Sequence, residues 1–171
     1  AEHAKDVHEV PGGSNRGPEL DKYLPDAVKK PGEQGPPWCC FFYSWVAHEA
    51  LGAWPLGRRI GGCAEARGVA GSLGLWTPKF VAVEQKRLIP GDAFVMDKGG
   101  GHGHIGYVLR VNADGTQINT LEGNCGNRVK LGLRNLADPE IVGYINDVQN
   151  ELTSTFDRGI VDYVPPSARH L

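Results

Sequence analysis

The sequence lacks several features that mark other classes of protein. No apolar run approaches the roughly 20 residues needed to span a bilayer, and the opening AEHAKDVHEV is charged and has no apolar centre, unlike a secretory signal. A net charge of -2 provides no basic field, so nucleic-acid binding is disfavoured. Four cysteines in 171 residues are too few for a disulfide scaffold. These absences leave an ordinary globular protein.

Glycine and proline are abundant instead, with 24 and 12 residues. They indicate many tight turns, and therefore a fold rich in strands or loops rather than a helical bundle. A length of 171 residues suits one domain better than two. We expect a polar N-terminal arm at residues 1–18, a catalytic domain at 19–150 and a C-terminal tail at 151–171.

The apolar pattern changes along the chain from a helical period to a strand period. Residues 39–51 contain no glycine or proline and Gly52 provides a stop, which predicts a buried helix. Shorter helices are expected near 20–28 and 65–76. Later alternation predicts strands at 93–96, 104–111, 116–124, 128–136 and 142–147. The order predicts an α+β fold, with N-terminal helices on a mostly antiparallel sheet of about five or six strands.

Cys39 is the first candidate for chemistry. It follows a proline-rich loop and begins the predicted helix, where unpaired N–H groups and the helix dipole stabilise a thiolate. Cys40 lies about 100° further around the helix and cannot share this role. The alternative is that both cysteines are small buried core residues.

A nucleophilic cysteine needs a base within hydrogen-bonding reach. The segment GGGHGHIGYVLRV offers His102 and His104, which have the same strand parity. His104 directly precedes an apolar run and should be held in the sheet, so we select it as the base. His102 lies among glycines and is expected to be an exposed loop histidine.

A predicted hairpin supplies the candidates for the third group, the residue that orients the histidine. The Asp-Gly turn at 114–115 should pair two strands and bring residues 122–124 beside 104–106. Glu122 and Asn124 are two residues apart and are expected on the same side. Either could accept the imidazole N–H and fix its tautomer. The alternative is a solvated glutamate and a turn asparagine.

Three ordered blocks carry a family resemblance. PPWCCFFYSWVAHEALG, PGDAFVMDKGGGHGHIGYVL and LEGN resemble the blocks of CHAP domains, which are cysteine, histidine-dependent amidohydrolases and peptidases of the papain-like NlpC/P60 superfamily. The match covers roughly residues 15–146. It implies a papain-like fold with no metal or cofactor, Cys39 as nucleophile, His104 as general base and Glu122 as its orienting partner, assisted by Asn124. Cys40 departs from the pattern, because the family usually has a small residue there.

The resemblance also implies a substrate and a place of action. We expect hydrolysis of peptidoglycan amide bonds through a thioester acyl-enzyme, at a periplasmic or extracellular cell wall. The export route is not visible in the chain. The expected partners are peptidoglycan or a peptide substrate. An immunity or inhibitor protein is a further candidate partner. We expect the protein to be a monomer. A phage endolysin, a secreted antibacterial toxin and a housekeeping hydrolase all fit.

Three other interpretations remain open. A zinc site would draw its ligands from Cys39, Cys40, Cys63, His102, His104 and Cys125, although the cysteines lack the spacing of structural zinc sites. A non-catalytic cell-wall-binding module would use Trp38, Trp54 and Trp76 to line a groove. A papain-like amidase could act on another small peptide or polyamine conjugate. The pairing of Cys63 and Cys125 is undetermined.

Overall fold

The computed structural model describes residues 7–84 and 88–146, so the predicted tail at 151–171 lies outside the described residues. The helices are α1 (Cys39–Leu51), α2 (Cys63–Ser72) and α3 (Lys79–Glu84), with short 3₁₀ turns at Asp26–Val28 and Pro55–Gly57. The strands are β1 (Trp76–Pro78), β2 (Ala93–Asp97), β3 (Gly103–Val111), β4 (Gln117–Glu122), β5 (Lys130–Asn135) and β6 (Ile141–Ile145). Within the described ranges, none of the helices combines the length and apolar character required to cross a bilayer.

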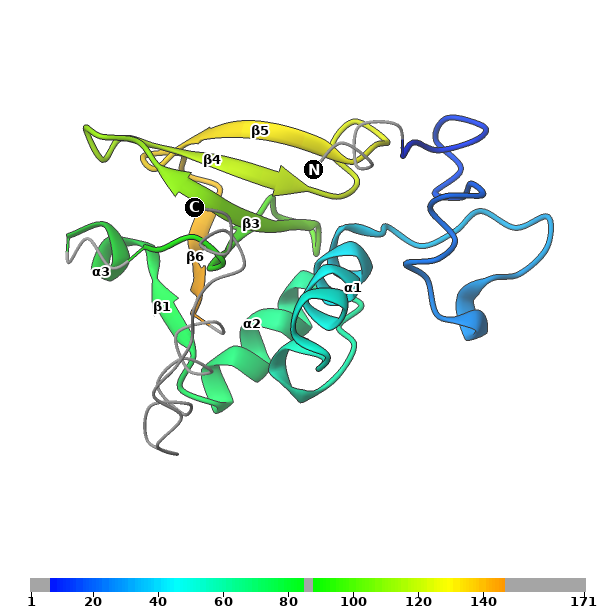
Figure 1. The fold of residues 1–171 in the computed structure, drawn as a ribbon, viewed down its shortest axis with the longest axis horizontal. Coiled ribbons are helices and arrows are strands. Elements are labelled where there is room, and N and C mark those ends of the chain that lie inside the picture. Colours follow the sequence, from blue (N-terminus) through cyan, green and yellow to red (C-terminus); the bar gives the residue numbers. More distant parts are fainter. Residues whose placement is uncertain (1–6, 85–87, 147–171) are drawn as a thin grey trace, which may run out of the picture.

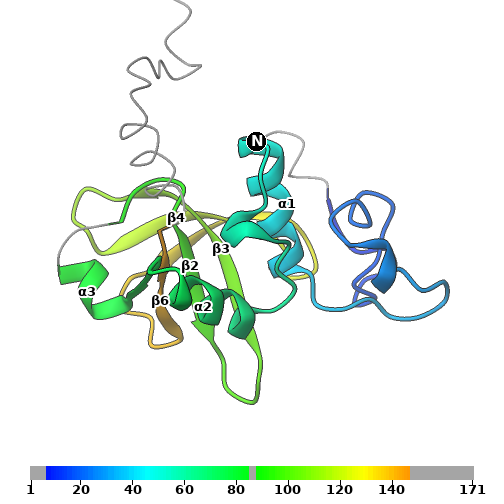
Figure 2. The same ribbon diagram turned by 90° about the horizontal axis from the view of Figure 1, so that it is seen from below.

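The six strands form one antiparallel sheet in the order β1-β6-β2-β3-β4-β5. Helices α1 and α2 lie together on one side of it, and α3 lies apart from them near β1 and β6 (Figures 1 and 2). This confirms the predicted α+β, papain-like architecture. The long helix at 39–51 and its stop at Gly52, which is left-handed with φ 70°, are also confirmed.

Alternation along the strands separates two apolar layers. Towards α1 and α2 the sheet presents one set of buried side chains, which are Ala93, Val95, Ile105, Tyr107 and Ile145. The other face packs with Ala82 of α3, and its members are Phe94, Met96, Val108, Ile118, Ile141 and Tyr144. Adjacent residues of β2 therefore point to opposite faces, as a strand period of two requires.

Three local predictions differ from the structure. The helix expected near 20–28 is reduced to a 3₁₀ turn at Asp26–Val28, immediately after Pro25. The preceding residues form i to i+3 turns, which still bury Leu20 and Leu24 completely or nearly so. Strand β1 and helix α3 were not predicted, because three and six residues are too short for a periodic pattern.

The start of α1 is held from several directions. Trp38, immediately before the helix, is fully buried, and its indole Nε1 donates to Oε1 of buried Glu9 at 3.0 Å. Within the helix, Ser44 Oγ accepts the backbone N–H of Ile60 at 2.8 Å. The hydroxyl of Tyr107 on β3 donates to the backbone carbonyl of Tyr43 at 2.8 Å. These bonds fix where Cys39 lies relative to the sheet.

Gly123 allows α1 to approach the end of β4. A Cβ atom built on Gly123 would overlap with Cβ and the ring of Phe42, in the first turn of α1. The overlap involves the base of the Phe42 side chain, which a rotamer change cannot move. The glycine therefore determines how closely the first turn of α1 sits against the sheet.

We predict that Gly123→Ala will lower the free energy of unfolding by about 1–3 kcal/mol, because the added methyl group overpacks this contact. Gly68→Ala is the matched control, since Gly68 lies inside α2 and a Cβ atom there meets nothing within 4 Å. It should stabilise the protein by up to about 1 kcal/mol through helix propensity. Urea unfolding of the wild type and both variants measures these free energies. Equal free energies of unfolding for Gly123→Ala and the wild type would contradict this packing.

Candidate active site

Cys39 lies where two helix N-termini converge. It is the first residue of α1, and Cys63 is the first residue of α2. Neither N-cap residue, Trp38 or Gly62, donates or accepts a side-chain capping hydrogen bond. Since the first N–H groups of a helix have no partner within it, both ends favour negative charge in the space between them.

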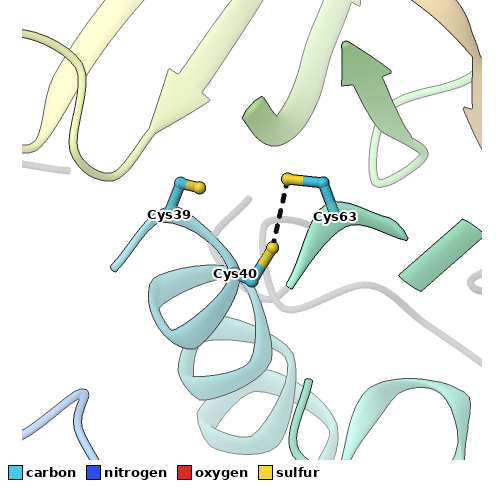
Figure 3. A group of neighbouring side chains, drawn as sticks. All are labelled: Cys39, Cys40 and Cys63. Carbon is cyan, nitrogen blue, oxygen red and sulfur yellow. Dashed lines mark hydrogen bonds between the residues drawn. The ribbon is translucent and has the colours of Figure 1, made fainter. Parts of the chain in front are cut away.

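Three sulfur atoms occupy that space. The Sγ atoms of Cys39, Cys40 and Cys63 all lie within 4.8 Å of one another. The Sγ atoms of Cys40 and Cys63 are 3.3 Å apart. Figure 3 shows the side chains directed towards one another from the starts of the two helices. All four cysteines are free thiols in this structure.

His104 lies near the start of β3 and is only 5 % exposed. Its Nε2 is 2.7 Å from Oε2 of Glu122, at the end of β4. Glu122 pairs across the hairpin with Gly106, as the expected alignment of 122–124 with 104–106 required. Residues 104 and 106 share a strand face, so this register brings the imidazole and the carboxylate together.

Glu122 is a fully buried carboxylate with four donors. Oε1 accepts hydrogen bonds from Thr120 Oγ1 at 2.6 Å and from Arg134 Nε at 2.9 Å. Oε2 accepts from Arg134 Nη2 as well as from the His104 ring. Burial alone would raise the pKa of Glu122, but the bonds from His104, Arg134 and Thr120 outweigh it and lower the pKa far below its ordinary value.

Two glycines make room for this carboxylate. A Cβ atom on Gly106 of β3 would lie 2.9 Å from Cγ of Glu122. A Cβ atom on Gly132 of β5 would lie 2.6 Å from both Oε1 of Glu122 and Oγ1 of Thr120. Arg134 is two residues beyond Gly132 on the same strand face, and it reaches Glu122 across this gap.

The surroundings of the Cys39 thiol favour its ionised form. Interactions with the thiols of Cys40 and Cys63 lower its pKa well below the ordinary value, burial opposes them, and a hydrogen bond and charge interaction with His104 add to the lowering. A thiol is a weak donor, whereas a protonated imidazole carries a full charge, so His104 is the decisive partner.

His104 responds in the opposite direction. Burial lowers its pKa, but interactions with Cys39 and then Glu122 outweigh burial, and the pKa is raised. Because Nε2 faces Glu122, Nδ1 is the ring nitrogen left for the sulfur. A thiolate–imidazolium pair is therefore favoured over two neutral groups.

Strand alternation cannot place Asn124 relative to Glu122, and the assistance of Asn124 to His104 stays a prediction. Strand β4 ends at Glu122, and Asn124 has a left-handed backbone with φ 59°, so strand alternation does not extend to it. Its amide donates to Oδ1 of Asn15 at 3.4 Å. His102 is exposed in the turn before β3, as expected.

Five of the six ligands of the zinc interpretation fall into two groups in the structure. Cys39, Cys40 and Cys63 form one group, and His104 forms another with Glu122 and Cys125. His102 belongs to neither of these groups within the described ranges. A metal ion held by the first group would occupy the Cys39 sulfur and remove it from nucleophilic chemistry.

A cavity of about 670 Å³ borders the sulfur cluster on the α2 side. Cys63 lines the cavity, and its other lining residues include Arg67, Trp76, Asp97 and His102. The Arg67 guanidinium lies over the Trp76 ring, 5.4 Å from the ring centroid. Of the three tryptophans expected to line a groove, Trp76 lines this cavity, whereas Trp38 is fully buried.

Sequence reasoning missed Thr120, Arg134 and the meeting of Cys63 with the two helix-start cysteines. Thr120 had a usable signal, because it lies two residues before Glu122 on the same strand face. Arg134 could have been suspected from Gly132, a small residue that leaves space for a long side chain. No local signal in the sequence indicated the position of Cys63, because the loop between α1 and α2 sets it.

The family model of the CHAP domain matches residues 31–124, which is more than half of the chain and includes Cys39, His104 and Glu122. Comparison with curated proteins and with solved structures gave no match.

We predict that Glu122→Gln will slow the alkylation of Cys39 by iodoacetamide roughly tenfold at pH 7. The carboxylate raises the pKa of His104, so its loss lowers that pKa, leaves less imidazolium beside the sulfur and raises the pKa of Cys39. The alkylation profile against pH should therefore move to higher pH.

Cys39→Ala gives the background from the other thiols, and Glu19→Gln, at a 70 % exposed carboxylate paired with Lys22, is the matched control. Circular dichroism checks that each variant is folded. An unchanged profile in folded Glu122→Gln would contradict the coupling of Glu122 to Cys39 through His104.

Proposed function

The chain belongs to the CHAP family of papain-like, cysteine- and histidine-dependent amidohydrolases and peptidases, and we propose that it cleaves amide bonds of peptidoglycan with Cys39 as nucleophile. The observation that carries the proposal is the continuous chain of interactions from Cys39 to His104 and from His104 to Glu122. A nucleophile, a base and an orienting group in this order are the requirements of cysteine hydrolases.

The first half of the reaction is acylation. The Cys39 thiolate attacks the amide carbonyl, and the developing oxyanion is met by free backbone N–H groups in the first turn of α1. His104, in its imidazolium form, then donates a proton from Nδ1 to the leaving amine. The products of this half-reaction are a thioester on Cys39 and a free amine.

The second half of the reaction is hydrolysis. Neutral His104 now takes a proton from water, which attacks the thioester and releases the carboxylate product and the Cys39 thiolate. Throughout, Glu122 accepts the Nε2–H of His104 and keeps Nδ1 directed towards the sulfur. Arg134 binds Glu122 through two nitrogens, which keeps the carboxylate ionised and fixed in orientation.

Two observations support a peptidoglycan substrate. The family resemblance favours it, and the cavity next to Cys63 provides space for a substrate that extends beyond the bond being cut. Action at the cell wall follows from this substrate. A monomeric state and an immunity or inhibitor protein as partner stay predictions.

Two alternative functions predict different results with purified peptidoglycan. A non-catalytic wall-binding module would bind peptidoglycan without releasing fragments, and Cys39 would not be required. An amidase for another peptide conjugate would need Cys39 and His104 but would leave purified peptidoglycan intact. Elemental analysis of protein purified without chelator tests the zinc interpretation.

We predict that the wild-type protein will release fragments from purified peptidoglycan, and that Cys39→Ala will lower the rate at least about a thousandfold. Mass spectrometry of the fragments identifies the bond, because each cleaved amide leaves a new amine and a new carboxylate. His104→Ala should lose turnover as well, since no base remains beside the sulfur.

The matched control is His48→Ala, which removes a half-exposed histidine in the last turn of α1. It should retain the wild-type rate. Equal fragment release by Cys39→Ala and wild type would refute the nucleophile assignment. Intact peptidoglycan together with a reactive Cys39 would favour the amidase for another conjugate.

A further inference from the structure

The three-thiol cluster contains two cysteines that the proposed mechanism does not use. Cys40 and Cys63 have their Sγ atoms 3.3 Å apart, and both lie within 4.8 Å of the Cys39 sulfur. They come from the first turns of two different helices, so each is held in place by its own element (Figure 3). Gly103 of β3 leaves room for Cys63, because a Cβ atom there would lie 2.7 Å from Cys63 Cβ.

The three sulfurs differ in exposure. Cys39 and Cys40 are 6 % and 1 % exposed, whereas Cys63 is partly exposed and lines the cavity next to α2. A small oxidant that enters this cavity therefore reaches the cluster on the Cys63 side. A peptidoglycan hydrolase works at the cell wall, where conditions are oxidising and an activated thiolate is at risk.

We propose that Cys40 and Cys63 form a protective dithiol, which is oxidised to a disulfide in place of Cys39 and leaves Cys39 as the free, reactive thiol. The proposal rests on the proposed function for the role of Cys39 as nucleophile and for the oxidising surroundings of the cell wall. The disulfide chemistry itself stands on the geometry of the three sulfurs.

The first step is oxidation of Cys39 by a peroxide, which we take as the oxidant. The Cys39 thiolate attacks one peroxide oxygen, the O–O bond breaks, and the products are a sulfenic acid on Cys39 and hydroxide. The Cys63 thiol then condenses with the sulfenic acid, which forms a Cys39–Cys63 disulfide and releases water. Cys40 is unsuited to this step, because consecutive Cα atoms are about 3.8 Å apart, closer than disulfides usually allow.

The second step is thiol–disulfide exchange. Cys40, after its proton has passed to the hydroxide released in the first step, attacks the Cys63 sulfur, which lies 3.3 Å away. A Cys40–Cys63 bond forms, the Cys39–Cys63 bond breaks, and Cys39 leaves as a thiolate. The overall reaction converts one peroxide and two thiols into one disulfide and two water molecules.

The direction of this exchange follows from thiol acidity. In the reduced protein, interactions with Cys40 and Cys63 and with His104 lower the pKa of Cys39, whereas contact with Cys39 raises the pKa values of Cys40 and Cys63. When Cys40 and Cys63 form a disulfide their thiol hydrogen bonds are lost, but His104 stays beside Cys39 and still favours its thiolate. The thiol with the lowest pKa is the best leaving group and the most stable thiolate. Exchange therefore ends with the disulfide between the other two sulfurs.

The test treats reduced protein, freed of reductant, with one equivalent of hydrogen peroxide and then blocks remaining thiols with iodoacetamide. We expect tandem mass spectrometry to find Cys40 linked to Cys63 and Cys39 alkylated. Fragmentation between Cys39 and Cys40 distinguishes the two linkages. Peroxide-treated wild type should also keep most of its peptidoglycan-cleaving rate.

The variants separate the two steps. In Cys40→Ala, oxidation should stop at the Cys39–Cys63 disulfide. The rate of peptidoglycan cleavage by the oxidised variant, divided by the rate of the reduced variant, should then fall at least tenfold below the wild-type ratio. Dithiothreitol should restore the rate. In Cys63→Ala, a second equivalent of peroxide should take Cys39 from the sulfenic to the sulfinic acid, and dithiothreitol should not restore the rate. Cys125→Ser, which removes the thiol outside the cluster, is the matched control and should show the wild-type ratio.

A Cys39–Cys63 disulfide as the end product in wild type, or free thiols at both Cys40 and Cys63 after oxidation, would overturn the proposal. The linkage assay requires no substrate and can be made on wild type alone if a variant fails to fold. A correct linkage without any peptidoglycan cleavage would therefore refute the proposed function and leave the dithiol in place.

Discussion

The arrangement of the site depends on one buried interaction, the hydrogen bond between the Glu122 carboxylate and the His104 imidazole. A carboxylate with no exposed surface is very unfavourable unless its oxygens are satisfied. Here four hydrogen bonds satisfy them, and three of these come from Thr120 and the two nitrogens of Arg134. The carboxylate is thereby kept charged, and a charged carboxylate favours the imidazolium that in turn stabilises the Cys39 thiolate.

Packing of the fold brings the two halves of this system together. The sheet supplies His104, Glu122 and Arg134 through the register of β3, β4 and β5, and small residues in these strands leave space for the carboxylate. Helix α1 supplies Cys39, and it reaches the sheet closely because Gly123 has no side chain. The loop between α1 and α2 adds Cys63, so that a second helix N-terminus faces the same sulfur.

Local sequence signals predicted the parts of the molecule that have a clear period. The helix at 39–51, five of the six strands and the alignment of Glu122 with the histidine strand followed from apolar spacing and one Asp-Gly turn. Alternation could not place Asn124, because β4 ends at Glu122. Arg134 and Cys63 depend on how β5 and α2 pack in three dimensions, which no local pattern encodes.

The central claim is that the Cys39 thiolate and the His104 imidazolium form a charge pair supported by Glu122. NMR titration of the His104 ring in wild type and in Cys39→Ala tests it most directly, because ring shifts report the protonation of the imidazole itself. The account predicts a protonated ring at neutral pH in wild type and a lower pKa in Cys39→Ala, where the thiolate that raises it is missing. A neutral ring in wild type, or the same titration in both proteins, would contradict the account.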